Sequence, residues 1–197
     1  KNISVKSKSE ISDVIQLLSV GRSHWKKDYK TAIKAMAILK KENIAFHYTI
    51  IGVQEDEELL FMRSDLGLTK HVSFVSNINQ QEVYCKMIAS DLFLLPSIEE
   101  GIANVCIEAM FCNLPVLSTD CGGMTELIED NTTGFITSTR SPEKIANKIK
   151  EISKVGSKEL DLITFKAREK VMKQHSVTKM VTDMELLYSN ILNKENE

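Results

Sequence analysis

Short apolar segments alternate along the chain with longer segments whose apolar residues recur every three or four positions. The short segments are typical of strands buried in a parallel sheet, and the longer ones of helices that cover such a sheet. This pattern predicts an α/β fold with a doubly wound parallel sheet of about six strands, helices on both faces and further helices at the C-terminal end. The predicted strands span residues 14–20, 47–51, 72–75, 92–95, 116–118 and 135–136. The predicted helices span residues 28–42, 56–66, 80–88, 104–112 and 125–128, and another begins at Pro142.

The same pattern divides the chain into three parts. Residues 1–12 are polar and are expected to form a linker or a frayed end. Residues 13–156 hold the alternating strands and helices, and residues 157–197 carry only a helical pattern. Within this last part, residues 176–192 place apolar side chains at three- and four-residue spacing. Such a helix needs an apolar surface on which to lie.

Composition excludes several classes of protein. The 197 residues are 43% hydrophobic and 26% charged, which suits one globular α/β domain. A net charge of -2 gives no reason to expect a nucleic-acid partner. No apolar run reaches the ~18–20 residues needed to span a bilayer, and no signal peptide is visible. The first residue is Lys, which is consistent with a piece of a longer chain.

The four cysteines show neither a C-x-x-C spacing nor a histidine at metal-ligand spacing. We therefore expect reduced thiols in a cytoplasmic protein, with peripheral contact at the inner face of the membrane left open.

Candidate chemistry lies in the loops that follow the strands, because ligands of an open parallel sheet bind beyond the carboxyl ends of its strands. Neither a G-x-G-x-x-G fingerprint nor a P-loop is present, which argues against an NAD-dependent dehydrogenase and a P-loop ATPase. The first loop instead carries Arg22, Lys26 and Lys27, side chains suited to bind phosphate. Taken alone, an ordinary solvated basic turn is the simpler interpretation of these three residues.

Glu100 and Glu108 are the candidate carboxylates. On one helix, their eight-residue separation would place them ~12 Å apart along the axis. That distance is too long for two carboxylates sharing a proton, but it suits two acceptors on one long, hydroxyl-rich ligand. The amides of residues 101–104 open the helix and would face an anion. Without further context, two surface glutamates remain the alternative.

The residues around Glu100 and Glu108 resemble the E-x7-E signature of family 4 retaining glycosyltransferases. Residues 20–22 with Lys27 are similar to the "GR … KG" element of that family. The resemblance covers roughly residues 14–192. Its segments follow in register at residues 96–110, 113–116, 122–123, 126–128 and 131–135.

The resemblance implies a GT-B fold, in which two Rossmann-like domains face each other across a cleft. This chain resembles the C-terminal, donor-binding domain, which would transfer a sugar, of hexosyl type, from a UDP- or GDP-sugar to an unknown acceptor. The acceptor site would lie in a missing N-terminal domain, as would any membrane contact, and this chain alone would be inactive. The C-terminal helices would pack on the same domain or on the missing one. Neither a cofactor nor a metal is expected.

The resemblance also implies roles for individual residues. Arg22, Lys27 and Glu100 would be the catalytic residues, with the two cations on the diphosphate of the leaving nucleotide and Glu100 on the donor sugar. Glu108 would hold the ribose hydroxyls, and the base would lie near Ser76. The other expected donor-binding residues are Gly21, Gly101, Ile102, Ala103, Asn104 and Val105.

Three positions depart from the family pattern. Asp28 and Ala103 stand where glycine is usual, and Val53-Gln54 follows Gly52 where a second glycine is frequent. Asp28 would put a negative charge near Lys27, and so weaken or orient it. Two other functions remain open, namely a GT-B nucleotide-sugar epimerase and a non-catalytic module that binds nucleotide or sugar.

Overall fold

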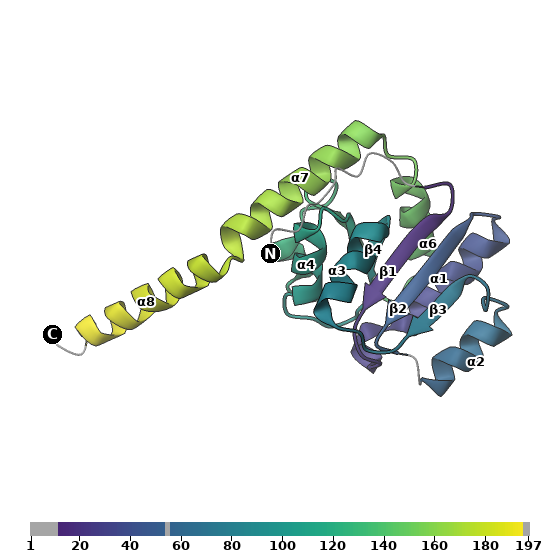
Figure 1. Ribbon diagram of the computed structural model, residues 1–197, viewed down its shortest axis with the longest axis horizontal. Helices are drawn as coiled ribbons and strands as arrows, with labels where there is room; N and C mark the ends of the chain where they lie inside the picture. Colours follow the sequence, from purple (N-terminus) through teal and green to yellow (C-terminus); the bar gives the residue numbers. More distant parts are fainter. Residues whose placement is uncertain (1–11, 54–55, 195–197) are drawn as a thin grey trace.

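The computed structural model describes residues 12–53 and 56–194, and it confirms the predicted parallel sheet (Figure 1). Most of the proposed linker, residues 1–11, lies outside the described residues. The six strands pair in parallel in the order β3-β2-β1-β4-β5-β6. They are β1 (Ile15–Val20), β2 (Phe46–Ile51), β3 (Val72–Val75), β4 (Leu92–Leu95), β5 (Val116–Thr119) and β6 (Phe135–Thr137).

Two helices, α3 (Gln80–Ala89) and α6 (Pro142–Ile152), begin where local sequence signals place them. Asn79 and Glu82 form a capping box at the start of α3, in which each side chain accepts a hydrogen bond from the other residue's backbone N–H. Pro142 occupies the first turn of α6, where its missing N–H costs nothing. The helices are η1 (Trp25–Lys27), α1 (Tyr29–Lys41), α2 (Glu57–Asp65), α3 (Gln80–Ala89), α4 (Asn104–Phe111), α5 (Met124–Leu127), α6 (Pro142–Ile152), α7 (Ser157–Gln174) and α8 (Val177–Lys194).

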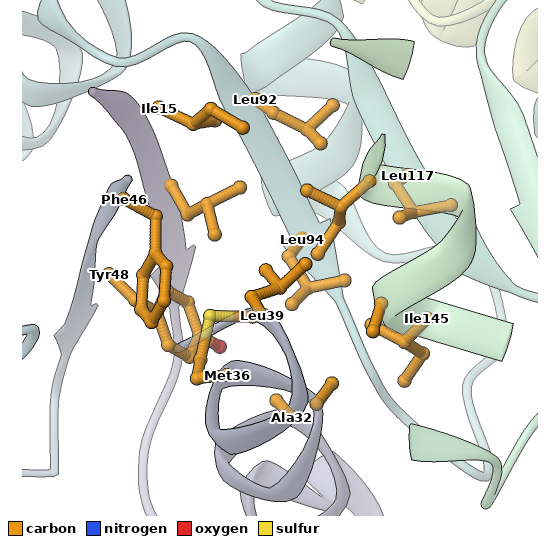
Figure 2. Packing of buried hydrophobic residues seen from close by; sticks show 14 of the residues in the cluster. Ile15, Ala32, Met36, Leu39, Phe46, Tyr48, Leu92, Leu94, Leu117 and Ile145 are labelled. Carbon is orange, nitrogen blue, oxygen red and sulfur yellow. The ribbon is translucent and has the colours of Figure 1, made fainter. Parts of the chain in front are cut away.

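The sheet separates two hydrophobic cores because successive strand side chains point to opposite faces. On β4, Leu92 and Leu94 enter the core formed with α1 and α6, part of which Figure 2 shows. Phe93 and Leu95 enter the core formed with α3, α4 and α5. Helix α7 contributes to both cores, with Leu160 and Ile163 in the first and Ala167 and Val171 in the second.

The strand order reverses between β1 and β4. The chain moves from β1 toward β3 and then returns to place β4 on the other side of β1. The segments that follow β1 and β4 therefore leave the sheet in opposite directions and open a crevice between them, which is the usual ligand position in such sheets. The segment after β1 holds η1, and the segment after β4 leads to α4.

Glycines allow the loops at this edge to pack backbone against backbone. A Cβ atom on Gly122, whose φ is +52°, would overlap the carbonyl oxygen of Glu100. A Cβ on Gly123 would lie 2.9 Å from the carbonyl oxygen of Gly101, and the Gly123 N–H donates to the Glu100 carbonyl over 3.3 Å. The loop after β5 thus supports the loop after β4 and fixes the backbone at Glu100.

Helix α8 extends away from the sheet as the chain continues past α7 (Figure 1). The expected amphipathic helix forms, but its apolar residues are 43% to 74% exposed, so the rest of the described domain leaves them largely uncovered. Within the described residues, no helix has both the length and the apolarity that crossing a membrane requires. The exposed apolar residues of α8 are Val177, Met180, Val181, Met184, Leu186, Leu187, Tyr188, Ile191 and Leu192.

We predict that Phe93→Ala destabilises the domain strongly, because the Phe93 side chain is fully buried in the centre of the sheet. The expected loss in the free energy of unfolding is about 3–5 kcal/mol, measured by urea denaturation. The matched control is Phe61→Ala, since Phe61 is 73% exposed and its removal is expected to cost no more than about 0.5 kcal/mol. Equal losses in the two variants would contradict the assignment of Phe93 to the core.

We also predict that Gly122→Ala destabilises the domain, since alanine at a positive φ is strained and its Cβ would displace the Glu100 carbonyl. The expected cost is about 2 kcal/mol or more in urea denaturation. Gly101→Ala is the control, because a Cβ on Gly101 meets nothing within 4 Å. If Gly122→Ala is as stable as the control, the two loops do not pack as described.

Candidate functional site

An open cavity of ≈ 660 Å³ lies at the edge of the sheet where the segments after β1 and β4 diverge. Three parts of the chain build it, namely the β1–η1 segment, the start of α3 with the residues just before it, and the loop after β4 with the start of α4. Its lining residues are Val20, Gly21, Arg22, Lys27, Ile78, Gln80, Val83, Glu100, Ile102, Ala103, Asn104, Val105 and Glu108.

Lys27 and Glu100 form an ion pair in this cavity. The Lys27 Nζ atom lies 2.6 Å from Glu100 Oε1, and the two side chains are only 20% and 17% exposed. Ser97 donates from its hydroxyl to the same carboxylate oxygen over 2.8 Å, and Ser97 is fully buried. Lys27 and Glu100 therefore hold each other across the crevice, and Ser97 holds Glu100 from the same segment.

The N-terminus of α4 opens into the cavity without a side-chain cap. The N-cap residue is Ala103, which has no side-chain acceptor for the first helical amides, and the first turn contains no acidic residue. Ala103, Asn104 and Val105 all line the cavity. Together with Arg22, which is exposed, and Lys27, this helix end provides positive potential in one place.

Glu108 lies further along α4, at the α3 side of the cavity. Its carboxylate accepts a hydrogen bond from Gln80 Nε2 over 3.3 Å, and Gln80 Nε2 also donates to the Tyr84 hydroxyl over 2.9 Å. Burial, and then the negative charge of Glu108, raise the pKa of Tyr84. Gln80 thus links the carboxylate of α4 to the start of α3.

The backbone conformation at position 28 explains why aspartate can stand there in place of the glycine of the family pattern. Its φ of 45° and ψ of 43° lie in the left-handed region, which glycine adopts freely and aspartate tolerates. Asp28 ends η1 and caps α1, where its Oδ1 accepts from the Thr31 N–H over 3.4 Å. The partner of Lys27 is Glu100 rather than Asp28.

The other two departures from the family pattern are Ala103 and the residues after Gly52, and the structure shows a different environment for each. Ala103 has a φ of -74°, so this position does not need glycine. Val53 is buried in the core, while Gln54 lies outside the described residues. Gly52 itself approaches Gly21 closely, since a Cβ on Gly52 would lie 2.7 Å from the Gly21 carbonyl oxygen.

Three buried groups beside the cavity, one phenol and two thiols, are neutral at physiological pH. Burial, followed by the charge of Glu100, raises the pKa of Tyr29, whose hydroxyl donates to the Gly21 carbonyl over 3.1 Å. Burial is also the main cause that raises the pKa of Cys106 and, less deeply placed, of Cys121. Neither thiol is a nucleophile under these conditions, because nucleophilic attack requires the thiolate.

The cavity gathers most of the residues predicted from the sequence. Arg22, Lys27, Glu100 and Glu108 all line it, as do Gly21 and residues 102–105. Ser76 lies exposed directly after β3, and Gly101 is exposed on its loop; neither is among the lining residues.

The sequence assigned no binding role to four of the lining residues, namely Val20, Ile78, Gln80 and Val83. A signal for Gln80 was present, because the Asn79 cap fixes the start of α3 at the same edge of the sheet. Among the described residues, His, Cys, Asp and Glu form no group of three or more that could hold a metal ion. The His24 ring caps η1 by accepting from the Lys26 N–H, and the four cysteines are free.

Comparison with known proteins gives a family match over residues 2–169, to the family described as Glycosyl transferases group 1. The putative colanic acid biosynthesis glycosyltransferase WcaL of Escherichia coli (strain K12) is 30% identical over 179 residues, which are 87% of this chain and 44% of that protein. The chain therefore spans about half of the length of the curated relatives it matches.

Two solved structures repeat the fold. Anabaena Alr3699/HepE, in complex with UDP and glucose, has a TM-score of 0.81 at 22% identity over 90% of this chain and 49% of its own. The C-terminal domain of the group 1 glycosyl transferase LpcC from Francisella tularensis has a TM-score of 0.72 at 22% identity, over 83% of this chain and 89% of its own. With a family match over most of its sequence and a sheet shared with these structures, the chain belongs to the glycosyl transferases group 1 family.

Proposed function

We propose that this chain is the donor-binding half of a retaining GT-B glycosyltransferase, of hexosyl type, and that the cavity binds a UDP- or GDP-sugar. One observation carries the proposal: Arg22, Lys27 and the uncapped start of α4 supply positive potential in a cavity that also contains Glu100 and Glu108. A nucleotide sugar needs this combination, since its diphosphate is an anion and its ribose and sugar are rich in hydroxyl donors.

The cations act on the leaving group. As the bond between the anomeric carbon and the diphosphate oxygen breaks, negative charge grows on the diphosphate. Lys27 and Arg22, with the N-terminus of α4, stabilise that charge more strongly in the transition state than in the bound donor. This electrostatic role needs no metal or cofactor. Residues 102–105 line the cavity close to these groups and position the sugar and phosphate through the backbone.

The two carboxylates hold the neutral parts of the donor. Glu108 accepts hydrogen bonds from the ribose hydroxyls, at a position that Gln80 braces from α3. Glu100 accepts from hydroxyls of the donor sugar. The base then lies toward Ile78 and Ser76, on the loop that connects β3 to α3.

The remaining parts of the enzyme lie outside this chain. The relatives are about twice as long, and the LpcC domain of similar length is a C-terminal domain. We assign the acceptor site, and any contact with a membrane, to an N-terminal domain facing the cavity. The exposed apolar side of α8 is a candidate surface for that domain. The chain alone is expected to bind the donor weakly and to transfer no sugar. The UDP and glucose bound to HepE support a nucleotide sugar as the donor class.

Calorimetric titration of the chain with UDP, GDP and ADP tests the proposal. We expect UDP or GDP to bind, and Lys27→Ala to weaken this binding by about tenfold or more, because a charge-assisted contact to phosphate is lost. Glu108→Ala is expected to weaken it as well, through the ribose.

Lys26→Ala is the matched control for Lys27→Ala. Lys26 is the neighbouring lysine, but its Nζ pairs with the exposed Glu99 and it does not line the cavity. Its substitution should change nucleotide affinity by no more than about twofold, an effect of the size expected from screened surface charge. Failure of all three nucleotides to bind at millimolar concentration, or equal effects of the two lysine substitutions, would contradict the proposed site.

A further inference from the structure

Glu100 occupies the position in front of Lys27 that an incoming phosphate needs. Its Oε1 lies 2.6 Å from the Lys27 Nζ, just below the ~2.7–2.9 Å range typical of a charge-assisted hydrogen bond between a cationic N–H and a carboxylate. The pair is much less exposed than the neighbouring pair of Lys26 and Glu99, whose side chains are 38% and 58% exposed. Screening by solvent is correspondingly weaker at Lys27, so its pairing with Glu100 is the stronger of the two.

The Glu100 carboxylate has little freedom to withdraw when phosphate arrives. Its backbone is fixed by Gly122 and Gly123, which leave no space between the two loops. Its side chain is held by the hydroxyl of Ser97, which is fully buried. Phosphate that takes Lys27 from Glu100 therefore leaves a carboxylate in the same cavity, close to the phosphate and without its cation.

We propose that Glu100 discriminates between a nucleotide sugar and a free nucleoside diphosphate by competing with the phosphates for Lys27. Hydroxyl groups of a donor sugar give the displaced carboxylate new hydrogen-bond donors and so compensate for the lost ion pair. A free nucleoside diphosphate brings no such hydroxyls and carries additional negative charge on its terminal phosphate. It therefore meets an uncompensated carboxylate, and its binding is weakened.

This inference rests on the proposed function and adds a consequence for turnover. After the sugar has left, the diphosphate product shares the cavity with Glu100. The sugar hydroxyls that donated hydrogen bonds to the Glu100 carboxylate are then gone. Repulsion between the two anions, and the return of Lys27 to Glu100, favour release of the product. The same carboxylate thus favours binding of the donor over the product and limits occupation of the cavity by free nucleotides.

The test compares Glu100→Gln with Glu99→Gln, which removes the same charge one residue away from a carboxylate outside the cavity. UDP and GDP are titrated into each variant of this chain by calorimetry, and the better ligand is then compared with its glucose, galactose, N-acetylglucosamine or mannose derivative, whichever binds tightest. We expect Glu100→Gln to bind the free diphosphate about fivefold more tightly than the wild type. The preference for the sugar derivative over the free diphosphate should fall by about tenfold or more. Glu99→Gln should match the wild type in both measurements.

The other outcomes separate failure of the donor site from failure of the proposed exchange, in which phosphate and Glu100 compete for Lys27. If the wild type binds nucleotide and Glu100→Gln shows no gain for the free diphosphate, the exchange is wrong and the donor site remains. An equal gain for the sugar derivative also overturns the exchange, because Glu100 would then repel phosphate without contacting the sugar. If neither protein binds any nucleotide, the donor site and the exchange both fail. Glu100→Ala, which also removes the charge, replaces the Gln variant if urea denaturation shows that variant to be unfolded.

Discussion

The reversal of strand order between β1 and β4 is the constraint on which the site depends. Because the two strands are adjacent and parallel, their carboxyl ends lie side by side, yet the segments that follow them leave in opposite directions. Contacts between the two segments bridge this crevice. The Ile98 N–H donates to the Lys26 carbonyl over 2.8 Å, and the ion pairs of Lys26 with Glu99 and of Lys27 with Glu100 follow in register. Two segments that lie 73 residues apart in sequence are thus joined across the crevice.

Close backbone packing at the same edge of the sheet fixes the position of these two segments relative to each other. Gly52 allows the loop after β2 to approach Gly21, and Gly122 allows the loop after β5 to support Glu100. Side chains at these positions would separate the loops by the width of a methyl group. Since a charged hydrogen bond weakens rapidly with distance and misalignment, the position of the Glu100 carboxylate relative to Lys27 depends on glycines that do not line the cavity.

The sequence predicts the fold more completely than the site because strands and helices leave local signals. Apolar runs that stop before Gly21 and Gly52 predict β1 and β2, and the helical pattern of residues 80–88 predicts α3; the structure confirms all three elements. The pairing of Lys27 with Glu100 leaves no local signal, because it arises only when β4 is inserted beside β1. The path of the loop after β3 is equally non-local. That loop leaves Ser76 exposed and brings Ile78 and Gln80 to the cavity, and neither outcome is visible in its composition.

Lys27 and Glu100 satisfy each other's charge inside the cavity. An isolated lysine or glutamate in a half-buried position would lose solvation without gaining a partner, which is costly. Pairing Lys27 with Glu100 avoids that cost, and the Ser97 hydroxyl donates to the same carboxylate oxygen. The same pairing sets a condition on any ligand, since an anion that separates the pair must replace the interactions of both members. An anion alone replaces only the partner of Lys27. A ligand that joins an anionic group to hydroxyl donors replaces both, and this requirement follows from the two side chains before any substrate is named.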